Sequence, residues 1–211
     1  MKTLIKKRKL KGLPTLEVLR NVVRKNKEIK QIEARAYYYV PHKISSSKEE
    51  KIILLSREEF LNDDLLKDHA NALKEGWNIG INSRVKLKNG KIAHIPMLDL
   101  APRKSAVSLR KLTARIGKMI KPVFGGGYII ETGKSYHYLG KKVFPDNLFE
   151  EFCGRSLIAS IVTVTPEGIP NIHEHIADYR YIGYSLVRHF TCMRITTRGD
   201  KTFEPRVIAE V

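Results

Sequence analysis

The sequence predicts an α+β fold. Segments with apolar residues at helical spacing are mixed with short segments of β-branched and aromatic residues. The pair Asn89-Gly90 lies between two of these strand-like segments, where it favours a tight hairpin turn. Hairpins mixed with helices argue against a doubly wound parallel sheet.

The first elements follow from local patterns. Leucine and valine recur at helical spacing after Pro14, which can start a helix. Residues 34–40 are rich in aromatics, which predicts a strand. Ser56 followed by Glu59 forms a capping box and predicts a helix to about Glu75.

The same reasoning gives the later elements. Alternating or β-branched runs predict strands, and apolar residues on one face predict helices. We expect helices over 14–30, 56–75, 105–120, 145–160 and 181–187. We expect strands over 34–40, 51–55, 85–88, 91–100, 123–124, 128–131, 136–139, 190–196 and 206–210, with 85–88 and 91–100 forming the hairpin. A loop is expected over 76–83, a β-branched segment over 161–165 and a turn over 166–170.

Three units are expected along the chain. Residues 1–12 form a basic tail, which is either a solvated end or a phosphate-binding arm. Residues 13–80 form an N-terminal α/β unit, and residues 81–211 form the main unit. The two units together form one compact domain with two lobes at this length.

The charge of the chain indicates an anionic partner. There are 39 Lys and Arg residues against 22 Asp and Glu, which gives a net charge of +17. Nucleic acid is the favoured partner, because phosphate contacts release counterions. The basic residues are spread along the chain rather than gathered on one amphipathic helix, which argues against a membrane surface.

Nothing in the sequence resembles a secretory signal or a membrane span. No run of about 18 apolar residues occurs, and the N-terminus lacks the apolar stretch of a signal peptide. Cys153 and Cys192 are too few for a disulfide framework or a four-cysteine zinc site, and Cys153 is expected to be a buried structural thiol. We expect a cytoplasmic or nucleoid-associated protein.

Two aspartates are candidate metal ligands. Asp99 ends an apolar strand in IPMLDLAP, and Asp178 begins the segment DYRYIGYSLVRHF. A carboxylate at a strand end is a common metal ligand. The alternatives are a turn-capping role for Asp99 and a helix N-cap role for Asp178, whose neighbouring arginines would then be solvated.

The segment GGGYIIETGKSYHYLG suggests a phosphate site. Gly133, Lys134 and Ser135 could offer an amide, a cation and a hydroxyl. His137 lies two residues after Ser135 and would share its face of the strand. The pattern is not a P-loop, because the required upstream glycine is missing. The alternative is an ordinary β-turn with a structural histidine.

A third hypothesis is a metal site in a different segment. His173 and His175 flank Glu174 and precede Asp178, and they could chelate a transition metal for a hydrolase or nuclease. The zinc-protease pattern HExxH is absent. Solvated loop residues are the alternative.

In this order the motifs resemble the archaeo-eukaryotic primase superfamily, the primase-polymerases. In that family one strand carries Asp-x-Asp, a later strand carries Ser-x-His, and a third motif has a single Asp. The resemblance covers roughly residues 85–200. The first motif corresponds to Met97-Leu98-Asp99-Leu100-Ala101, the second to Ser135-Tyr136-His137 and the third to Asp178. The later segment Cys192-Met193-Arg194-Ile195 resembles the Leu-Arg-Ile segment that often follows the third motif.

The resemblance implies a fold and an activity. The fold would be an RRM-like antiparallel palm sheet with flanking helices over 81–211, beside the smaller N-terminal α/β unit. The activity would join nucleoside triphosphates on a template, DNA rather than RNA, in a basic cleft with Mg²⁺ or Mn²⁺. No helicase or zinc module is recognisable, so a helicase or another replication or repair activity would come from a partner. The resemblance implies that Asp99 and Asp178 hold the metals, that Ser135 and His137 bind the triphosphate, and that Arg194 contacts phosphate. Lys134, from the turn before Ser135, is expected to bind the same triphosphate.

The chain departs from the family pattern at one position. Ala101 stands where the first motif has its second Asp, so the site is one carboxylate short unless Glu131 or Glu174 replaces it. The alternative function is therefore a catalytically degenerate module that binds nucleic acid or nucleotide. Such a module could use the tyrosines at 37–39, 136 and 138 as stacking surfaces, although strand packing is the other role open to them.

Overall fold

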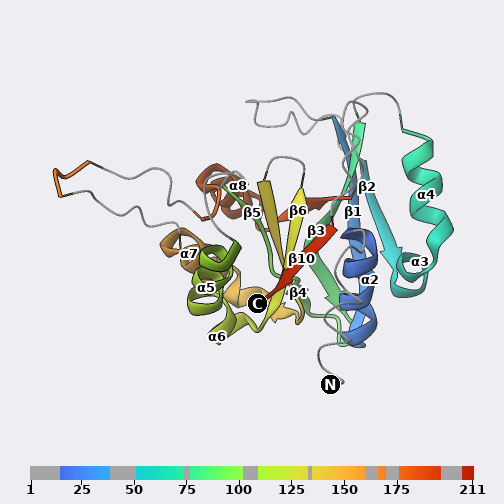
Figure 1. Cartoon of the computed structure of the whole chain (residues 1–211). Coiled ribbons are helices and arrows are strands. Elements are labelled where there is room, and N and C mark those ends of the chain that lie inside the picture. The colour runs from blue at the N-terminus through green and yellow to red at the C-terminus, as the bar shows by residue number, and fades with distance from the viewer. Residues whose placement is uncertain are drawn as a thin grey trace, which may run out of the picture.

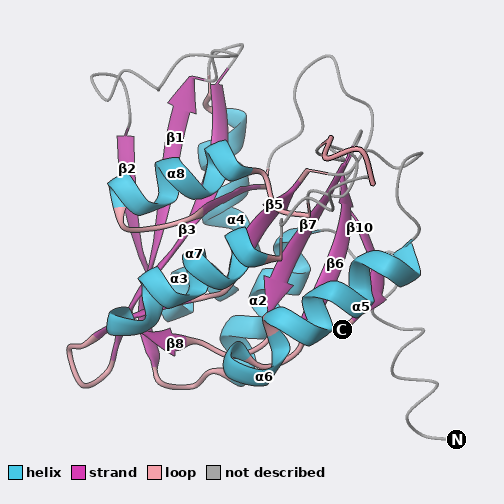
Figure 2. Cartoon of the chain, turned by 90° about the vertical axis from the view of Figure 1, so that its left-hand side faces the viewer, coloured by secondary structure: helices cyan, strands magenta, loops and turns pink. Residues whose placement is uncertain are grey.

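Two antiparallel sheets and the helices around them make up the fold (Figures 1 and 2). A computed structural model describes residues 15–38, 51–73, 77–101, 109–132, 135–159, 166–169, 176–195 and 206–211. The α+β class expected from the sequence is confirmed. The basic tail over 1–12 and the segment 161–165 lie outside the described residues.

The larger sheet has six strands in the order β2-β1-β3-β4-β8, with β9 also paired to β3. The predicted loop over 76–83 is wrong, because β3 starts at Trp77 and pairs with β1 from there. The expected unit boundary at residue 80 thus falls inside β3, and the division of the chain into two units stays a prediction. The strands are β1 (Ile29–Tyr38), β2 (Lys51–Ser56), β3 (Trp77–Leu87), β4 (Ile92–His94), β8 (Phe144–Pro145) and β9 (Cys192–Arg194).

The smaller sheet has four strands in the order β10-β6-β7-β5. The single strand predicted over 91–100 is divided at Ile95-Pro96, and its two parts belong to different sheets. Proline lacks the N–H that would continue a ladder, and the carbonyl of Pro96 instead accepts from the N–H of Gly140 at 2.7 Å. The strands are β5 (Met97–Leu100), β6 (Gly127–Thr132), β7 (Ser135–Gly140) and β10 (Arg206–Glu210).

The helices agree with the predicted ones except at three places. The helix predicted over 14–30 ends at Lys25, and β1 begins at Ile29, earlier than the strand predicted over 34–40. The helix predicted to Glu75 is divided at Asn62, although its capping box between Ser56 and Glu59 is confirmed. The strand predicted over 123–124 is a short helix with Pro122 in its first turn. The helices are α2 (Thr15–Lys25), α3 (Arg57–Leu61), α4 (Asp63–Asn71), α5 (Leu109–Met119), α6 (Lys121–Phe124), the 3₁₀ helix η2 (Asp146–Leu148), α7 (Phe149–Ile158) and α8 (Tyr179–Arg188). None of them, in the part of the chain described, is long and apolar enough to cross a bilayer.

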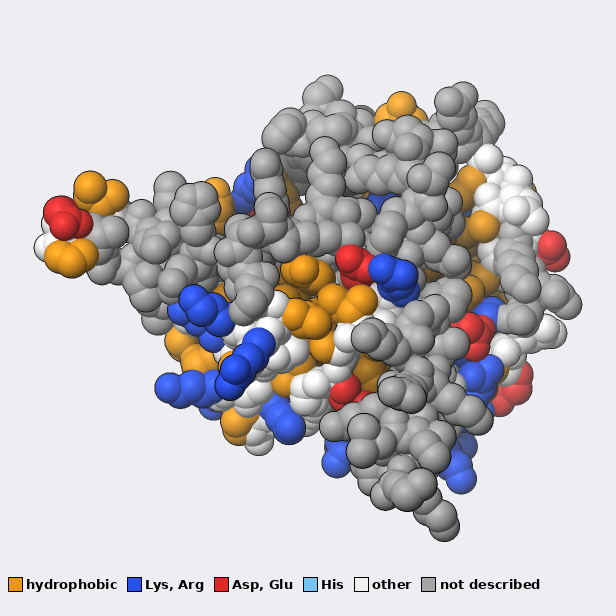
Figure 3. Space-filling view, viewed as in Figure 1, with side chains coloured by type: hydrophobic (Ala, Val, Ile, Leu, Met, Phe, Trp, Pro, Cys, Tyr) orange, Lys and Arg blue, Asp and Glu red, His pale blue; other side chains and the backbone are white. Residues whose placement is uncertain are grey.

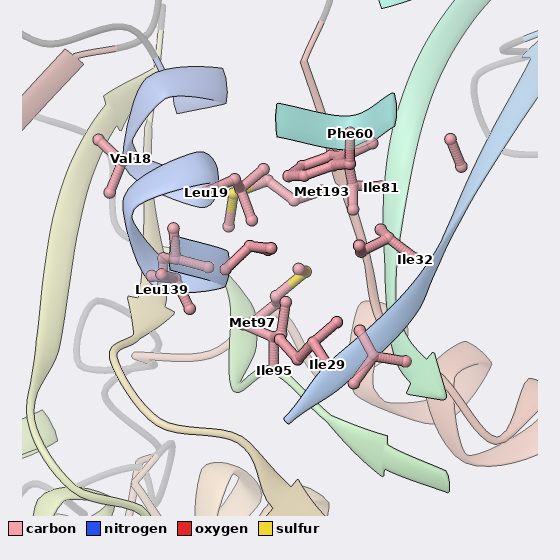
Figure 4. Packing of buried hydrophobic residues seen from close by; sticks show 14 of the residues in the cluster. Val18, Leu19, Ile29, Ile32, Phe60, Ile81, Ile95, Met97, Leu139 and Met193 are labelled. Carbon is pink, nitrogen blue, oxygen red and sulfur yellow. The ribbon is translucent and has the colours of Figure 1, made fainter. Parts of the chain in front are cut away.

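The four-stranded sheet has a hydrophobic core on each face. Ile129 packs into the core formed with α5 to α8, which lie on one side of this sheet in Figure 1. The neighbouring Ile130 points to the opposite face, where the second core includes α2, α3 and the six-stranded sheet. Figure 4 shows this second core, with Leu139 and Met97 close to Leu19 of α2. Because the second core joins both sheets, a side chain on this face can meet residues of the larger sheet.

Substituting Gly140 is expected to destabilise the fold where the chain passes between sheets. A Cβ at this position would lie 2.5 Å from Cγ of Pro96, a rigid ring that cannot move aside. We expect Gly140→Ala to lower the free energy of unfolding by about 1–3 kcal/mol. In the control Gly154→Ala, the new Cβ meets no atom within 4 Å, and this helical substitution should stabilise by about 0.5–1 kcal/mol. Urea unfolding would measure both, and equal stability of Gly140→Ala and the wild type would contradict the contact with Pro96.

Candidate active site

Strand pairing places Asp99 directly opposite His137. These residues are register partners in the antiparallel pair β5–β7, two positions along from the apolar partners Met97 and Leu139. Because side chains two apart share a face, both point to the face of the second core, where its apolar packing ends. The imidazole Nε2 of His137 lies 3.5 Å from the carboxylate Oδ1 of Asp99, and the side chains are 17% and 40% exposed.

The chain returns to this place at Asp178. Its backbone N–H donates to the carbonyl of Asp99 at 3.0 Å, next to a bridge between Leu100 and Ala177. The side chain also caps α8: Oδ1 accepts from the backbone N–H groups of Arg180 at 2.8 Å and Tyr181 at 3.2 Å. The N-cap alternative is therefore confirmed. It leaves Oδ2 available, 3.7 Å from the guanidinium of Arg180.

The charges at the site act on one another. Burial, and then the negative charge of Asp178, raise the pKa of Asp99 to about 7, against the opposing effect of Arg194. Burial, and then the positive charge of Arg194, lower the pKa of His137 to about 4. The shifts show that Asp178 and Arg194 lie near this pair of strands. A carboxylic acid poised near neutrality beside a second carboxylate is a common signature of functional sites.

Arg194 reaches the site from the larger sheet. It lies on β9, where it is the register partner of Gly80 of β3. Position 80 has no room for a larger side chain, because a Cβ there would lie 2.5 Å from Sγ of Cys192. The hydroxyl of Tyr181 accepts from the N–H of Cys192 at 3.2 Å and donates to its carbonyl at 3.0 Å. Tyr181 thus connects α8, which begins at Asp178, to the strand that carries Arg194.

Sequence reasoning missed Gly80 and Tyr181. Burial raises the pKa of Tyr181 well above its usual value, with smaller contributions from Cys192 and Asp99, so the phenol stays protonated and can donate. The spacing between Tyr181 and Cys192 carries no recognisable motif. Only the helical period, which places the half-buried Tyr181 on the face of α8 toward β9, could have suggested it.

Ser135 and Lys134 are the other two residues predicted to bind the triphosphate, and the structure describes only Ser135. Ser135 shares the face of His137, as expected, and its hydroxyl donates to the carbonyl of Leu100. It would have to leave this partner to donate to a phosphate. Lys134, like Gly133, lies outside the described residues.

No third carboxylate of the described residues replaces the one missing at Ala101. Glu131 follows Ile130 on β6, so it points away from the face of Asp99, and it pairs with Arg206 at 2.9 Å. Of the two substitutes left open by the sequence, Glu131 is therefore excluded. Glu174 lies outside the described part of the chain, as do His173 and His175 of the alternative metal site.

Of the described tyrosines considered as stacking surfaces, some are buried in the core and one is exposed. Tyr136 and Tyr138 are 6% and 0% exposed, so they pack in the core with α5 to α8. Of the two roles open to them, strand packing is therefore confirmed for Tyr136 and Tyr138, and stacking on bases is excluded by their burial. Tyr38 is exposed and meets Trp77 edge to face, with ring centroids 6.3 Å apart; Tyr39 lies outside the described residues.

The antiparallel sheet carries Asp99 opposite His137, and Asp178 lies beside them, in the order of the motifs that resemble the primases. The family model of archaeo-eukaryotic primase 1D-like proteins matches residues 57–205. The chain belongs to this family and has its primase-related nucleotide- or nucleic-acid-binding fold. No curated protein and no solved structure matches the chain.

The opposite pKa shifts predict a distinctive dependence of stability on pH. The pKa of the His137 imidazole is 6.5 in the unfolded chain and about 4 in the folded chain. Between these pH values the imidazole is protonated mainly in the unfolded chain, so acid destabilises the fold. The pKa of the Asp99 carboxyl is 3.8 in the unfolded chain and about 7 in the folded chain. Between these pH values the carboxyl is protonated mainly in the folded chain, so acid stabilises the fold. In the wild type the two effects oppose each other between about pH 4 and 6.5.

Single variants should reveal the two effects separately. Relative to the wild type, Asp99→Asn is expected to lose stability on acidification from pH 6.5 to 4, by about 1 kcal/mol per pH unit at most. His137→Gln should gain stability over the same range, by less, because the 40% exposed carboxylate of Asp99 is screened by solvent. Urea unfolding at several pH values measures both, and parallel pH profiles of all three proteins would contradict the shifts.

Proposed function

We propose that this chain is a primase-polymerase-type nucleotidyltransferase, which binds a nucleoside triphosphate and a nucleic-acid template. One observation carries the proposal: Asp99, His137, Asp178 and Arg194, which come from four separate elements or their ends, converge where the two sheets meet. Phosphoryl transfer needs this combination of carboxylates for a divalent metal and donors for phosphate oxygens.

Asp99 and Asp178 are the residues that would hold one Mg²⁺ or Mn²⁺ ion. The negative charge of Asp178 makes ionisation of Asp99 less favourable, and a dication would remove this penalty. Carboxylate oxygens suit both metals, which keep several waters in such sites. When bound, the metal would supply neutralisation of the triphosphate charge. Asp99 and Oδ2 of Asp178 would hold it, while Oδ1 of Asp178 continues to cap α8.

The cationic and neutral donors have different roles at the triphosphate. His137 is neutral at pH 7 because its pKa is about 4, so it offers a phosphate oxygen one N–H bond and no charge. Arg194 brings a cationic guanidinium, which can bind two phosphate oxygens. We assign charge neutralisation to Arg194 and orientation of the triphosphate to His137, with Ser135 and Lys134 as further contacts.

A second function is favoured by Ala101. With one carboxylate fewer than the family pattern, the site suits one metal ion better than two, and in-line transfer uses two ions in many polymerases. The chain would then bind nucleotide and nucleic acid without efficient transfer. We therefore expect any nucleotide transfer to be slow.

Primer extension would separate the two functions. The assay uses a labelled primer on DNA and RNA templates with nucleoside triphosphates and either Mg²⁺ or Mn²⁺, and Asp99→Asn serves as the control for contaminating polymerases. Extension by the wild type that is absent from Asp99→Asn would support the transferase. No extension by either protein, together with triphosphate binding that needs Asp99, would overturn transfer and support the binding module.

A basic surface on α5 and α6 is suited to the nucleic-acid backbone. Neither helix has an acidic residue in its sequence, and Figure 3 shows Lys and Arg side chains gathered in this region. Its basic residues are Arg110, Lys111, Arg115, Lys118 and Lys121, and all of them except the half-buried Arg115 are exposed. Phosphate contacts by such residues position a template without specifying its sequence.

Removing charge from this surface should weaken nucleic-acid binding of every sequence alike. For the double variant Arg110→Ala, Lys111→Ala we expect the slope of log affinity against log salt to fall by about 1 for each phosphate group that the variant no longer neutralises. Lys51→Ala, which removes an exposed charge from β2 far from α5 (Figures 1 and 2), is the matched control. Fluorescence anisotropy at several salt concentrations measures the slopes. Equal slopes for the double variant and the control would exclude this surface.

A further inference from the structure

A second set of metal-ligating side chains lies away from the primase-like site. His94 of β4, Asp146 at the start of η2, and His189 at the end of α8 place one ligand atom each within 4.8 Å of one another. Nε2 of His94 lies 2.8 Å from Oδ1 of Asp146, and Nε2 of His189 lies 3.3 Å from the same oxygen. Both imidazoles therefore converge on one carboxylate oxygen.

These distances suit a tetrahedral metal ion. Zinc–nitrogen and zinc–oxygen bonds of about 2.0–2.2 Å place neighbouring tetrahedral ligands about 3.3 Å apart. The His189–Asp146 separation already has this value. The His94–Asp146 separation would have to open by about half an ångström, which a side-chain rotation of the half-exposed Asp146 can provide.

The hydrogen bonds behind His94 can support ligation. Its Nδ1 lies 3.0 Å from the hydroxyl of Ser83, which accepts from the backbone N–H of Thr191 at 3.0 Å. When Nε2 of His94 binds a metal, its proton moves to Nδ1, which then donates to the hydroxyl oxygen of Ser83. Ligating histidines commonly donate from their second nitrogen in this way, and the bond fixes the ring.

The backbone at His189 is a second, independent observation. His189 ends α8 with φ at 59°, and it is the one non-glycine residue with a positive φ in the described parts of the chain. Glycine is the usual residue at this position of a helix end, because a Cβ makes the left-handed conformation less favourable. Histidine here brings an imidazole to Asp146, and its ring packs on Phe149 with centroids 4.9 Å apart.

We propose that His94, Asp146 and His189 bind a zinc ion, with water as the fourth ligand. Two imidazoles and a carboxylate favour zinc over Mg²⁺, which prefers oxygen ligands alone. His94 is fully buried, whereas Asp146 and His189 are 45% and 48% exposed, which gives the ion and its water a route from solvent. The zinc would tie the end of α8 to β4 and η2, and the other end of this helix carries Asp178.

Zinc titration of the full chain tests the proposal. The protein, freed of any histidine tag and stripped with a chelator, is titrated with Zn²⁺ against a coloured zinc indicator. We expect one tight site, and a loss of affinity of at least about 100-fold in both His189→Gly and Asp146→Asn. His189→Gly suits the positive φ and should fold well. His69→Gln, which changes a histidine on α4, and Asp99→Asn are the controls and should keep the tight site.

Cobalt supplies a second readout. Co²⁺ in the same site should give the visible absorption of a tetrahedral complex, and His189→Gly should lack it. Equal zinc affinity of the wild type, His189→Gly and Asp146→Asn would overturn the proposal and leave a hydrogen-bonded cluster only. Because Asp99→Asn tests the nucleotide site separately, failure of one proposal is distinguishable from failure of the other.

Discussion

Asp99→Asn is expected to abolish the metal-dependent binding of nucleoside triphosphate. Asparagine keeps the size of the side chain and the backbone pairing of β5 with β7, but it removes the charge that would hold the metal. Loss of a metal-ligating carboxylate should weaken binding by at least about 100-fold. Calorimetry with a non-hydrolysable triphosphate, with and without Mn²⁺, measures the change.

A matched control distinguishes ligation from general charge. Asp68→Asn removes an exposed carboxylate from α4, on the outer side of the larger sheet (Figure 1), and should bind triphosphate as the wild type does. Tight Mn²⁺-dependent binding by Asp99→Asn would show that the metal is held elsewhere.

Asp178 combines two functions, and a pair of variants should separate them. Its Oδ1 caps α8 through two backbone N–H groups, and its charge raises the pKa of Asp99. Asp178→Asn retains a good N-cap, so its stability should equal that of the wild type while triphosphate binding is lost. Asp178→Ala should lose triphosphate binding and, in addition, about 1 kcal/mol of stability.

Urea unfolding and calorimetry on both variants give the two readouts. The pKa of Asp99 should also fall in Asp178→Asn, because a neighbouring negative charge has been removed. If Asp178→Asn bound triphosphate with Mn²⁺ as tightly as the wild type, Asp178 would be a helix cap without a part in the metal site.

Local sequence patterns were sufficient for elements whose cause is local. The capping box of Ser56 and Glu59 and the Asn89-Gly90 hairpin are both present in the structure. The start of β3 was missed for a physical reason. Asn78, Asn82 and Ser83 are buried polar residues on this strand, and their partners, such as Glu33 for Asn82, are distant in sequence.

The site could be predicted in part, because the order of the motifs along the sequence indicated its residues. Asp99, His137 and Asp178 follow one another in the expected order, and β5–β7 pairing brings the first two together. Nothing local indicated the connection from Tyr181 to Cys192. The His94–Asp146 contact spans 52 residues, so its geometry exists only in the folded chain.

Paramagnetic broadening by Mn²⁺ is the most direct test that Asp99, Asp178 and His137 form one triphosphate site. The measurement follows the imidazole resonances of a chain labelled at histidine, during titration with Mn²⁺ and triphosphate. The ring signals of His137 should broaden first, and Asp99→Asn should remove this broadening while leaving the other histidines unchanged. Sharp His137 signals at a Mn²⁺ concentration that saturates triphosphate binding would contradict the site.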